Sequence, residues 1–221
     1  MHNGKWRDAF PFDEAEQVVG SIKTTWDYLI KQNFKGFQPR THEPQLTIKL
    51  KLLLQSLCSE YGLTGYFTAE EVSGHLNLDT GEIENSGRTD IKYISRRVEE
   101  EFTFEFKKVT LKSDSRRKYH IDGIMRFVTG KYSPKKHFDF MVGIIVNECD
   151  AKKIYDSLVK SFAKPDLRAV LHMLEDESGK YIRKPSKELP DCTLFDTKHA
   201  RTLVPGSPDI IICHFYLSHI K

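Results

Sequence analysis

The centre of the chain alternates between apolar and polar side chains, one position at a time. Every even position from Phe102 to Phe106 is a phenylalanine, and Glu105 and Lys107 occupy odd positions beside them. A period of two predicts a β-strand over residues 102–111, with the phenylalanines facing the core. Glu105 and Lys107 are then expected on the opposite face, about 7 Å apart along the strand.

Three other apolar segments also predict strands. Residues 89–95 form a short strand candidate, with Ile91 and Tyr93 on one face. Residues 138–146 are almost continuously apolar, which is typical of a strand buried on both faces. Residues 209–218 predict a strand that closes the chain.

Apolar positions three and four residues apart predict helices elsewhere. The predicted helices cover residues 12–32, 43–61, 119–128 and 150–162. Thr68 and Glu71 fit a capping box, which predicts a further short helix between the second helix and the first strand. A loop is expected over 33–42, a turn over 79–81, either strand or helix over 167–174, and loops over 175–201.

This order of elements predicts an α/β fold with a central mixed β-sheet flanked by helices. We expect an N-terminal helical extension over residues 1–42 and a main domain over residues 43–221.

Composition limits the possible classes of protein. The net charge of +3 is too small to indicate nucleic-acid binding, so a basic surface would have to be local. The four cysteines show no zinc-ligand spacing, which favours a reduced, intracellular protein. No apolar run approaches the roughly 18 residues of a membrane span, and residues 1–12 do not form a signal peptide. We expect a cytoplasmic protein that has no membrane partner.

The acidic and basic residues of the central strands suggest a metal site. If residues 89–95 pair with residues 102–111 as a hairpin, Asp90 is expected beside Glu105, with Lys107 on the same face. Mg²⁺ prefers oxygen ligands and is commonly held by one or two carboxylates together with a substrate phosphate. A lysine beside the metal can orient a water or stabilise charge that develops at phosphorus. An amphipathic strand with a solvated Glu/Lys face is the alternative interpretation.

This pattern resembles the metal-binding core of the PD-(D/E)XK nuclease superfamily, whose fold is restriction-endonuclease-like. The resemblance covers about residues 43–146 and depends on Asp90 and on the Glu105-Phe106-Lys107 motif. It implies that Asp90 and Glu105 bind Mg²⁺, with Mn²⁺ as a substitute, and that Lys107 positions the attacking water. Thr89 stands where the family pattern has a proline.

Many members of the family have a further acidic residue on an early helix. By resemblance, Glu43 at the start of the second predicted helix is the candidate third metal ligand. Glu60, Glu70 and Glu71 are the alternatives.

A basic segment follows the proposed site and predicts contacts with nucleic acid, because phosphate contacts dominate non-specific affinity. Its candidate residues are Lys108, Lys112, Arg116, Arg117, Lys118 and Arg126. A solvated loop is the alternative interpretation, and no base-reading motif is present.

The leading hypothesis is therefore a metal-dependent endonuclease that hydrolyses DNA, with RNA as the alternative substrate. By family analogy it would act in restriction or anti-phage defence, as a homodimer or with a partner defence protein. The first alternative is a catalytically silent module of the same fold that binds nucleic acid or a partner. The second is a regulatory subunit that needs no nucleic acid.

Overall fold

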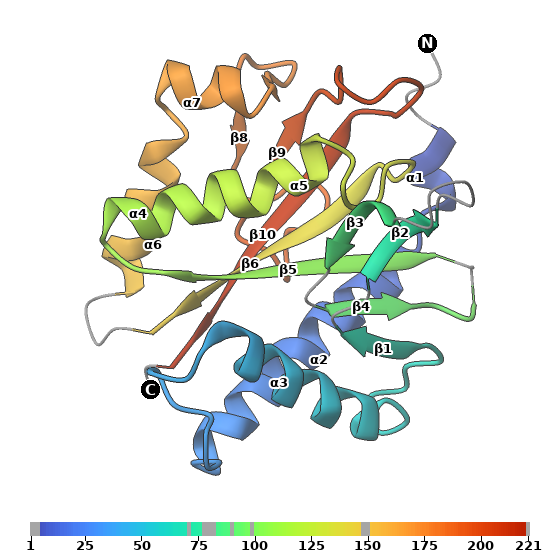
Figure 1. The fold of residues 1–221 in the computed structure, drawn as a ribbon, viewed down its shortest axis with the longest axis vertical. Coiled ribbons are helices and arrows are strands. Elements are labelled where there is room, and N and C mark those ends of the chain that lie inside the picture. The colour runs from blue at the N-terminus through green and yellow to red at the C-terminus, as the bar shows by residue number, and fades with distance from the viewer. Residues whose placement is uncertain are drawn as a thin grey trace.

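The computed structural model of the chain describes residues 5–69, 72–76, 83–88, 91–97, 100–146 and 151–219. In this part of the chain, helices cover both faces of one large mixed sheet (Figure 1). The α/β architecture predicted from the order of elements is confirmed.

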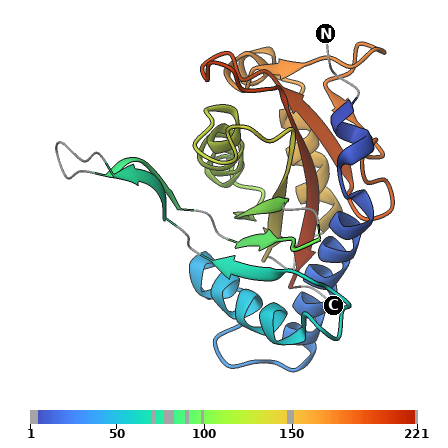
Figure 2. The same ribbon diagram turned by 90° about the vertical axis from the view of Figure 1, so that its right-hand side faces the viewer.

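The large sheet has parallel strands at its centre and antiparallel strands at both edges. Strands β5, β6 and β10 are parallel neighbours, and all other pairings are antiparallel. The order across the sheet is β1 (Tyr66–Ala69), β4 (Ile91–Ile94), β5 (Glu101–Val109), β6 (Phe138–Ile145), β10 (Ile210–Ser218), β9 (Phe195–His199) and β7 (Met173–Leu174), and β8 (Ile182–Arg183) also pairs with β9. A separate two-stranded ribbon of β2 (Val72–Leu76) and β3 (Ile83–Arg88) projects away from the sheet (Figure 2).

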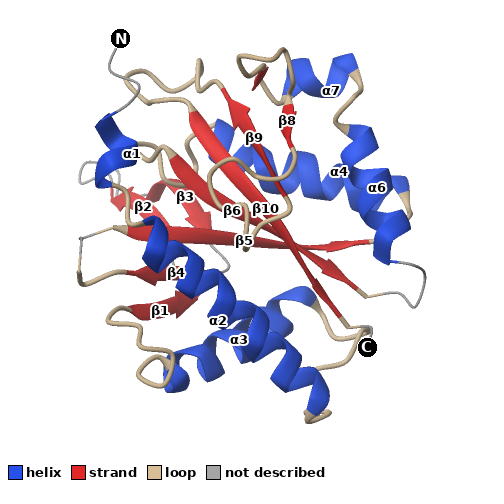
Figure 3. Cartoon of the chain, turned by 180° about the vertical axis from the view of Figure 1, so that it is seen from behind, coloured by secondary structure: helices blue, strands red, loops and turns tan. Residues whose placement is uncertain are grey.

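Two helical layers enclose the sheet. The first contains α2 (Phe12–Lys31), which crosses the sheet on the side seen in Figure 3, and α3 (Glu43–Leu57), which packs against α2 and the edge strand β1. The opposite face is covered by α4 (Ser113–Arg117), the π-helical segment η1 (Lys118–Ile124), α5 (Met125–Val128) and α6 (Ala151–Ser161). The short helices α1 (Lys5–Ala9) and α7 (Pro165–Val170) complete the set in the described residues.

The alternation of side chains along the strands divides the interior into two hydrophobic cores. Phe102, Phe104 and Phe106 of β5 pack on the side of α2 and α3, together with Trp26 and Leu50. The other face packs against η1, α5 and α6. Its buried residues include Val109, Met141, Ile212, Phe127 and Leu158. Strand β5 is therefore covered on both faces, which decides the environment of Glu105.

Most of the elements predicted from periodicity are confirmed. The helices over 12–32 and 43–61 and the strands over 102–111, 138–146 and 209–218 occur within a few residues of the predicted bounds. The segment over 167–174 contains both a helix and a strand, α7 and β7, and the expected turn at 79–81 lies outside the described residues.

Three predictions of local structure are wrong. The segment 175–201, where loops are expected, contains two strands of the large sheet, β8 and β9. Thr68 does not begin a helix, because it lies in β1 and pairs with Lys92 of β4. Pairing to a neighbouring strand here overrides the local capping preference. The helix predicted to start at Tyr119 begins earlier, at Ser113. No helix among the described residues has both the length and the apolar character that a bilayer span requires.

Candidate metal and phosphate site

Glu105 and Lys107 lie on the face of β5 opposite the phenylalanines, as the alternation predicts. Neither side chain is exposed to solvent as it would be on an uncovered face of a sheet. Glu105 is fully buried, and the Lys107 side chain is 11% exposed. The helical layer covers them: a Cβ added at Gly123 of η1 would lie 2.6 Å from Met141 Cε and 3.5 Å from Lys107 Cγ. Glycine at this position lets the helix approach the sheet closely.

The ammonium group of Lys107 binds carboxylates from two different elements. Its Nζ is 2.7 Å from Glu105 Oε1 and 3.1 Å from Glu43 Oε1. It also donates a hydrogen bond of 2.8 Å to the Phe106 carbonyl. Two carboxylates that are far apart in the sequence, on α3 and on β5, therefore contact the same ammonium group.

Glu43 is placed by the start of α3. It is the first residue of that helix, where an acidic side chain is favoured by the helix dipole. Its Oε2 accepts a hydrogen bond of 2.7 Å from the backbone N–H of Lys108, so Glu43 holds both the side chain of Lys107 and the end of β5. Among the alternatives, Glu60 is exposed beyond the end of α3, and Glu70 and Glu71 lie outside the described residues.

Arg126 of α5 also reaches Glu105. Its Nη1 donates a hydrogen bond of 2.9 Å to Glu105 Oε1 and another to the hydroxyl of Tyr132. The Arg126 guanidinium lies 5.5 Å from the centre of the Tyr132 ring, within the range of a cation–π contact. The sequence identified Arg126 only as one basic residue of a run. The contact between Arg126 and Glu105, the candidate metal ligand, follows from the packing of α5 over β5.

Asp90, the remaining predicted ligand, lies outside the described residues. The next residue, Ile91, pairs with Phe104 in the antiparallel β4–β5 ladder, so the predicted pairing of these two strands is confirmed. In the residues that the structure does describe, no group of three or more His, Cys, Asp or Glu side chains is arranged to hold a metal ion.

The other predicted nucleic-acid contacts differ in their exposure. Lys108 Nζ donates to the carbonyls of Pro39 and Thr41, so this lysine fastens the loop before α3. Burial lowers the pKa of Lys108, and the negative charge of Glu43 partly opposes this shift. Arg116 is half-buried, and its guanidinium donates to the Leu111 carbonyl. Three of the basic residues are exposed at or beside α4: Lys112, Arg117 and Lys118.

A further buried carboxyl lies on the same face of the sheet. Asp139 of β6 lies two positions before Met141, the residue paired with Glu105. It is fully buried, and its Oδ1 accepts a hydrogen bond of 2.7 Å from the Thr103 backbone N–H. Burial raises the pKa of Asp139 to about 7. The sequence offered no signal for this group, since Asp139 stands alone in an apolar run.

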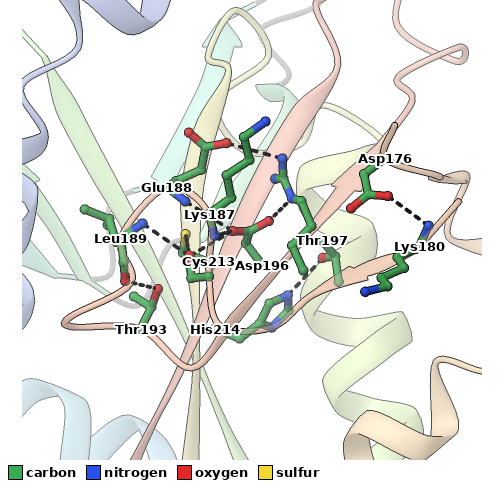
Figure 4. Close-up of polar contacts among 12 residues, drawn as sticks. Asp176, Lys180, Lys187, Glu188, Leu189, Thr193, Asp196, Thr197, Cys213 and His214 are labelled. Carbon is green, nitrogen blue, oxygen red and sulfur yellow. Dashed lines mark hydrogen bonds and ion pairs between the residues drawn. The ribbon is translucent and has the colours of Figure 1, made fainter. Parts of the chain in front are cut away.

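A second polar cluster surrounds Asp196 of β9, at the other side of the sheet (Figure 4). Its Oδ2 accepts hydrogen bonds from the Ser186 hydroxyl at 2.8 Å and from the Lys187 backbone N–H at 2.6 Å. Its Oδ1 forms an ion pair with Arg183. Burial raises the pKa of Asp196, and the Arg183 charge opposes this shift. These contacts close the segment 183–189 against β9, which is a structural role.

Two buried histidines lie in a chain of hydrogen bonds in which each donor and acceptor can be assigned. His199 Nδ1 lies 2.7 Å from the Leu171 carbonyl, which only accepts, so this nitrogen carries the proton. The other ring nitrogen of His199 then accepts from the Thr197 hydroxyl at 2.8 Å. Thr197 Oγ1 in turn accepts from His214 Nε2 at 2.9 Å, and the Tyr119 hydroxyl donates to His214 Nδ1 at 2.8 Å. Burial lowers the pKa of His199 to about 4 and that of His214 well below its usual value, which keeps both rings neutral.

Comparison of the chain with protein-family models, curated proteins and solved structures finds no match.

Proposed function

We propose that this chain is a divalent-metal-dependent nuclease whose site contains Glu43, Glu105 and Lys107. The observation that supports the proposal is that two carboxylates from α3 and β5 converge on the ammonium of one largely buried lysine. Burying three charged groups removes their hydration, which costs free energy. Apolar residues would fill a purely structural position at a lower cost.

The residues present suit a hard divalent cation. Glu43 and Glu105 both offer carboxylate oxygens, the ligand type that Mg²⁺ and Mn²⁺ prefer. The point between them is already a position for positive charge, since Lys107 Nζ lies within 3.1 Å of both. Asp90, which precedes Ile91 in the sequence, stays a predicted ligand together with Glu105, and Glu43 is the further acidic ligand. A bound metal would supply Lewis-acid activation of the phosphate and lower the pKa of a water.

The chain's own residues supply positioning and charge. The ammonium of Lys107 is fixed by contacts with two carboxylates and the Phe106 carbonyl. If a metal took up those carboxylates, the N–H donors that now face them would be positioned to orient a water nucleophile or to stabilise charge at phosphorus. Glu43 fixes that lysine and also the end of β5 through the Lys108 N–H. The hydrolysis we propose breaks a P–O bond of a phosphodiester. Water adds at phosphorus, and the leaving oxygen takes up a proton.

The element order near the site agrees with the sequence resemblance to PD-(D/E)XK nucleases. A helix that provides Glu43 precedes the β4–β5 pair, and a helical segment and the parallel strand β6 follow. DNA is the proposed substrate, with the exposed Lys112, Arg117 and Lys118 as phosphate contacts. A role in restriction or defence, and a homodimeric or partner-bound state, rest on the family analogy alone.

One observation favours the alternative of a silent binding module. Glu105 is fully buried and receives two cations, Lys107 and Arg126, on the same carboxylate oxygen. Such a network can also be a stable structural feature in which no metal enters. In that case the chain would bind nucleic acid or a partner without cleaving it.

Plasmid cleavage distinguishes the two functions. The full-length protein would be incubated with supercoiled plasmid and with single-stranded RNA, with Mg²⁺, Mn²⁺ or EDTA. The variants are Lys107→Ala, Glu105→Gln and the control Lys160→Gln, which removes one exposed charge on α6. Metal-dependent cleavage that is lost in the first two variants and kept in the control is the expected result. Full activity of Lys107→Ala would refute the assignment, and binding without cleavage in any metal would favour the silent module.

A further inference from the structure

A hollow of about 690 Å³ lies where two parallel strands of the large sheet end, beside the first turn of α6. Ile145 is the last residue of β6, Ser218 is the last residue of β10, and both line this hollow. In open α/β sheets, ligands commonly bind outside the carboxyl ends of the strands. The volume also falls in the range of sites that hold small organic molecules. The position and the size of the hollow therefore suit a small ligand.

The lining of the hollow is mainly apolar and aromatic. Leu194 contributes a side chain that is 43% exposed, so a ligand that covers it removes apolar surface from water. This lining selects a ligand with an apolar body. Its apolar and aromatic residues are Ile145, Ala151, Tyr155, Pro185, Leu194 and Tyr216.

The aromatic side of the hollow is held in place by the packing of two tyrosines. Tyr216 pairs with Gly143 of β6, and a Cβ added at Gly143 would lie 2.2 Å from Tyr216 Cδ1. A larger residue at 143 would therefore displace the Tyr216 ring. Tyr155 of α6 packs against the same ring, with the ring centroids 5.7 Å apart and the planes at 80°. The two rings fix each other, so the surface that a ligand would contact is already formed.

One lysine places a positive charge at this aromatic side. Lys184 is exposed, and its Nζ lies 4.4 Å from the centre of the Tyr155 ring. It forms no ion pair within the described part of the chain. Lys152, the other lysine at the hollow, is paired with Asp156 at 2.9 Å. Among the described residues that line the hollow, none is acidic. The Lys184 ammonium can therefore receive a negative group from a ligand whose apolar part contacts Tyr155.

We propose that this hollow binds an amphipathic carboxylate of the fatty-acid type. The acyl chain lies against Tyr155, Leu194 and Tyr216, and the carboxylate pairs with Lys184. A carboxylate suits Lys184 better than a neutral head group does, because a charge-assisted hydrogen bond is stronger than a neutral one. An acyl chain suits the lining better than a nucleobase does, because the polar edge of a base would lose its hydration against apolar residues. The site is separate from the candidate metal and phosphate site, and the proposal does not depend on the nuclease function.

The test is a calorimetric titration of the full-length protein with sodium hexanoate, octanoate and decanoate, at concentrations where these ligands do not self-associate. One ligand should bind per chain, and each added methylene should tighten binding about fourfold if the chain is buried. Octanol has the same chain length as octanoate but no charge. It should bind about fivefold more weakly, a modest difference because the Lys184 ammonium is exposed.

Two variants examine the two halves of the site. Lys184→Gln should weaken octanoate binding about fivefold and leave octanol binding unchanged. Leu194→Glu places a charge in the apolar hollow and should weaken both ligands on the order of tenfold or more. The matched controls are Lys160→Gln, at an exposed lysine of α6, and Leu203→Glu, at a leucine that is 62% exposed and does not line the hollow. Both controls should bind octanoate as the unmodified protein does.

The outcomes separate the site from the nature of its ligand. The site is overturned if no ligand of the series shows saturable binding, or if Leu194→Glu binds octanoate as tightly as Leu203→Glu does. The carboxylate assignment is overturned if octanoate and octanol bind equally and Lys184→Gln changes neither. Circular dichroism identifies a variant that fails to fold. Should Leu194→Glu be such a variant, the comparison of octanoate with octanol in Lys184→Gln decides the question.

Discussion

Lys107 Nζ lies 2.7 Å from Glu105 Oε1, although the two side chains leave β5 two residues apart along the strand. The lysine side chain therefore folds back along its own strand instead of extending away. Glu43 of α3 draws the same ammonium from the other direction. The pair is a buried ionic contact within one strand, and its properties lead to the first prediction.

Substituting Lys107 by methionine should destabilise the protein, because the fully buried Glu105 loses one of the two cations that contact it among the described residues. We expect a loss of about 1–3 kcal/mol, less than for an isolated buried pair because Arg126 remains. The double variant Glu105→Gln/Lys107→Met should recover part of this loss. Urea denaturation of the two single variants and the double variant measures the coupling. Strict additivity of the two losses would show that the contact contributes nothing.

Asp139 should make stability fall as pH rises. Its pKa is about 7 in the folded protein and near 4 when unfolded, so between these values the folded state binds more protons. Stability from this group is complete below about pH 4 and is lost as pH rises through about 7. Asp139→Asn removes that loss, so its stability relative to the unmodified protein should improve by on the order of 3–4 kcal/mol between pH 4 and pH 8. Urea denaturation at both pH values measures this, and a constant difference would contradict the prediction.

Thr197 links the two histidines of the buried chain, so replacing its hydroxyl should affect both. Thr197→Val leaves ring nitrogens of His199 and His214 without their partner. We expect a loss of about 2–5 kcal/mol, because each unsatisfied buried group costs roughly 1–3 kcal/mol. Thr197→Ser keeps the hydroxyl and should lose only about 1 kcal/mol. Chemical denaturation at pH 7 compares the two, and equal losses would rule out the hydrogen-bonded chain as the cause.

Asp196→Asn should loosen the segment 183–189. The new amide group would present N–H donors where Ser186, the Lys187 N–H and Arg183 already donate. We expect a loss of about 3–5 kcal/mol and faster proteolysis within this segment. The exposed Asp191→Asn serves as control and should stay within about 0.5 kcal/mol of the unmodified protein. Limited proteolysis with mass spectrometry locates the cuts, and unchanged cleavage would refute the proposed anchoring role.

The sequence by itself determined the secondary structure of β5 and which of its side chains lie on each face. The two-residue period from Phe102 to Lys107 depends only on the geometry of a strand, and the helix over 12–31 follows from an equally local spacing. The short helix expected at Thr68 does not form, because Thr68 lies in a strand. A capping box describes a local preference, and pairing with β4 supplies more hydrogen bonds than the cap.

Only the tertiary structure decided the environment of the site. No local pattern shows that Glu43, 64 positions before Lys107, binds its ammonium, or that Arg126, 21 positions after Glu105, reaches that carboxylate. The same alternation that separates Glu105 from the phenylalanines fits a solvated face equally well. Glu105 is buried because η1 and α5 pack over β5, and that packing depends on Gly123 and on contacts between segments far apart in the chain. Local periodicity places a side chain on a face, and long-range packing sets its solvation, its partners and its chemistry.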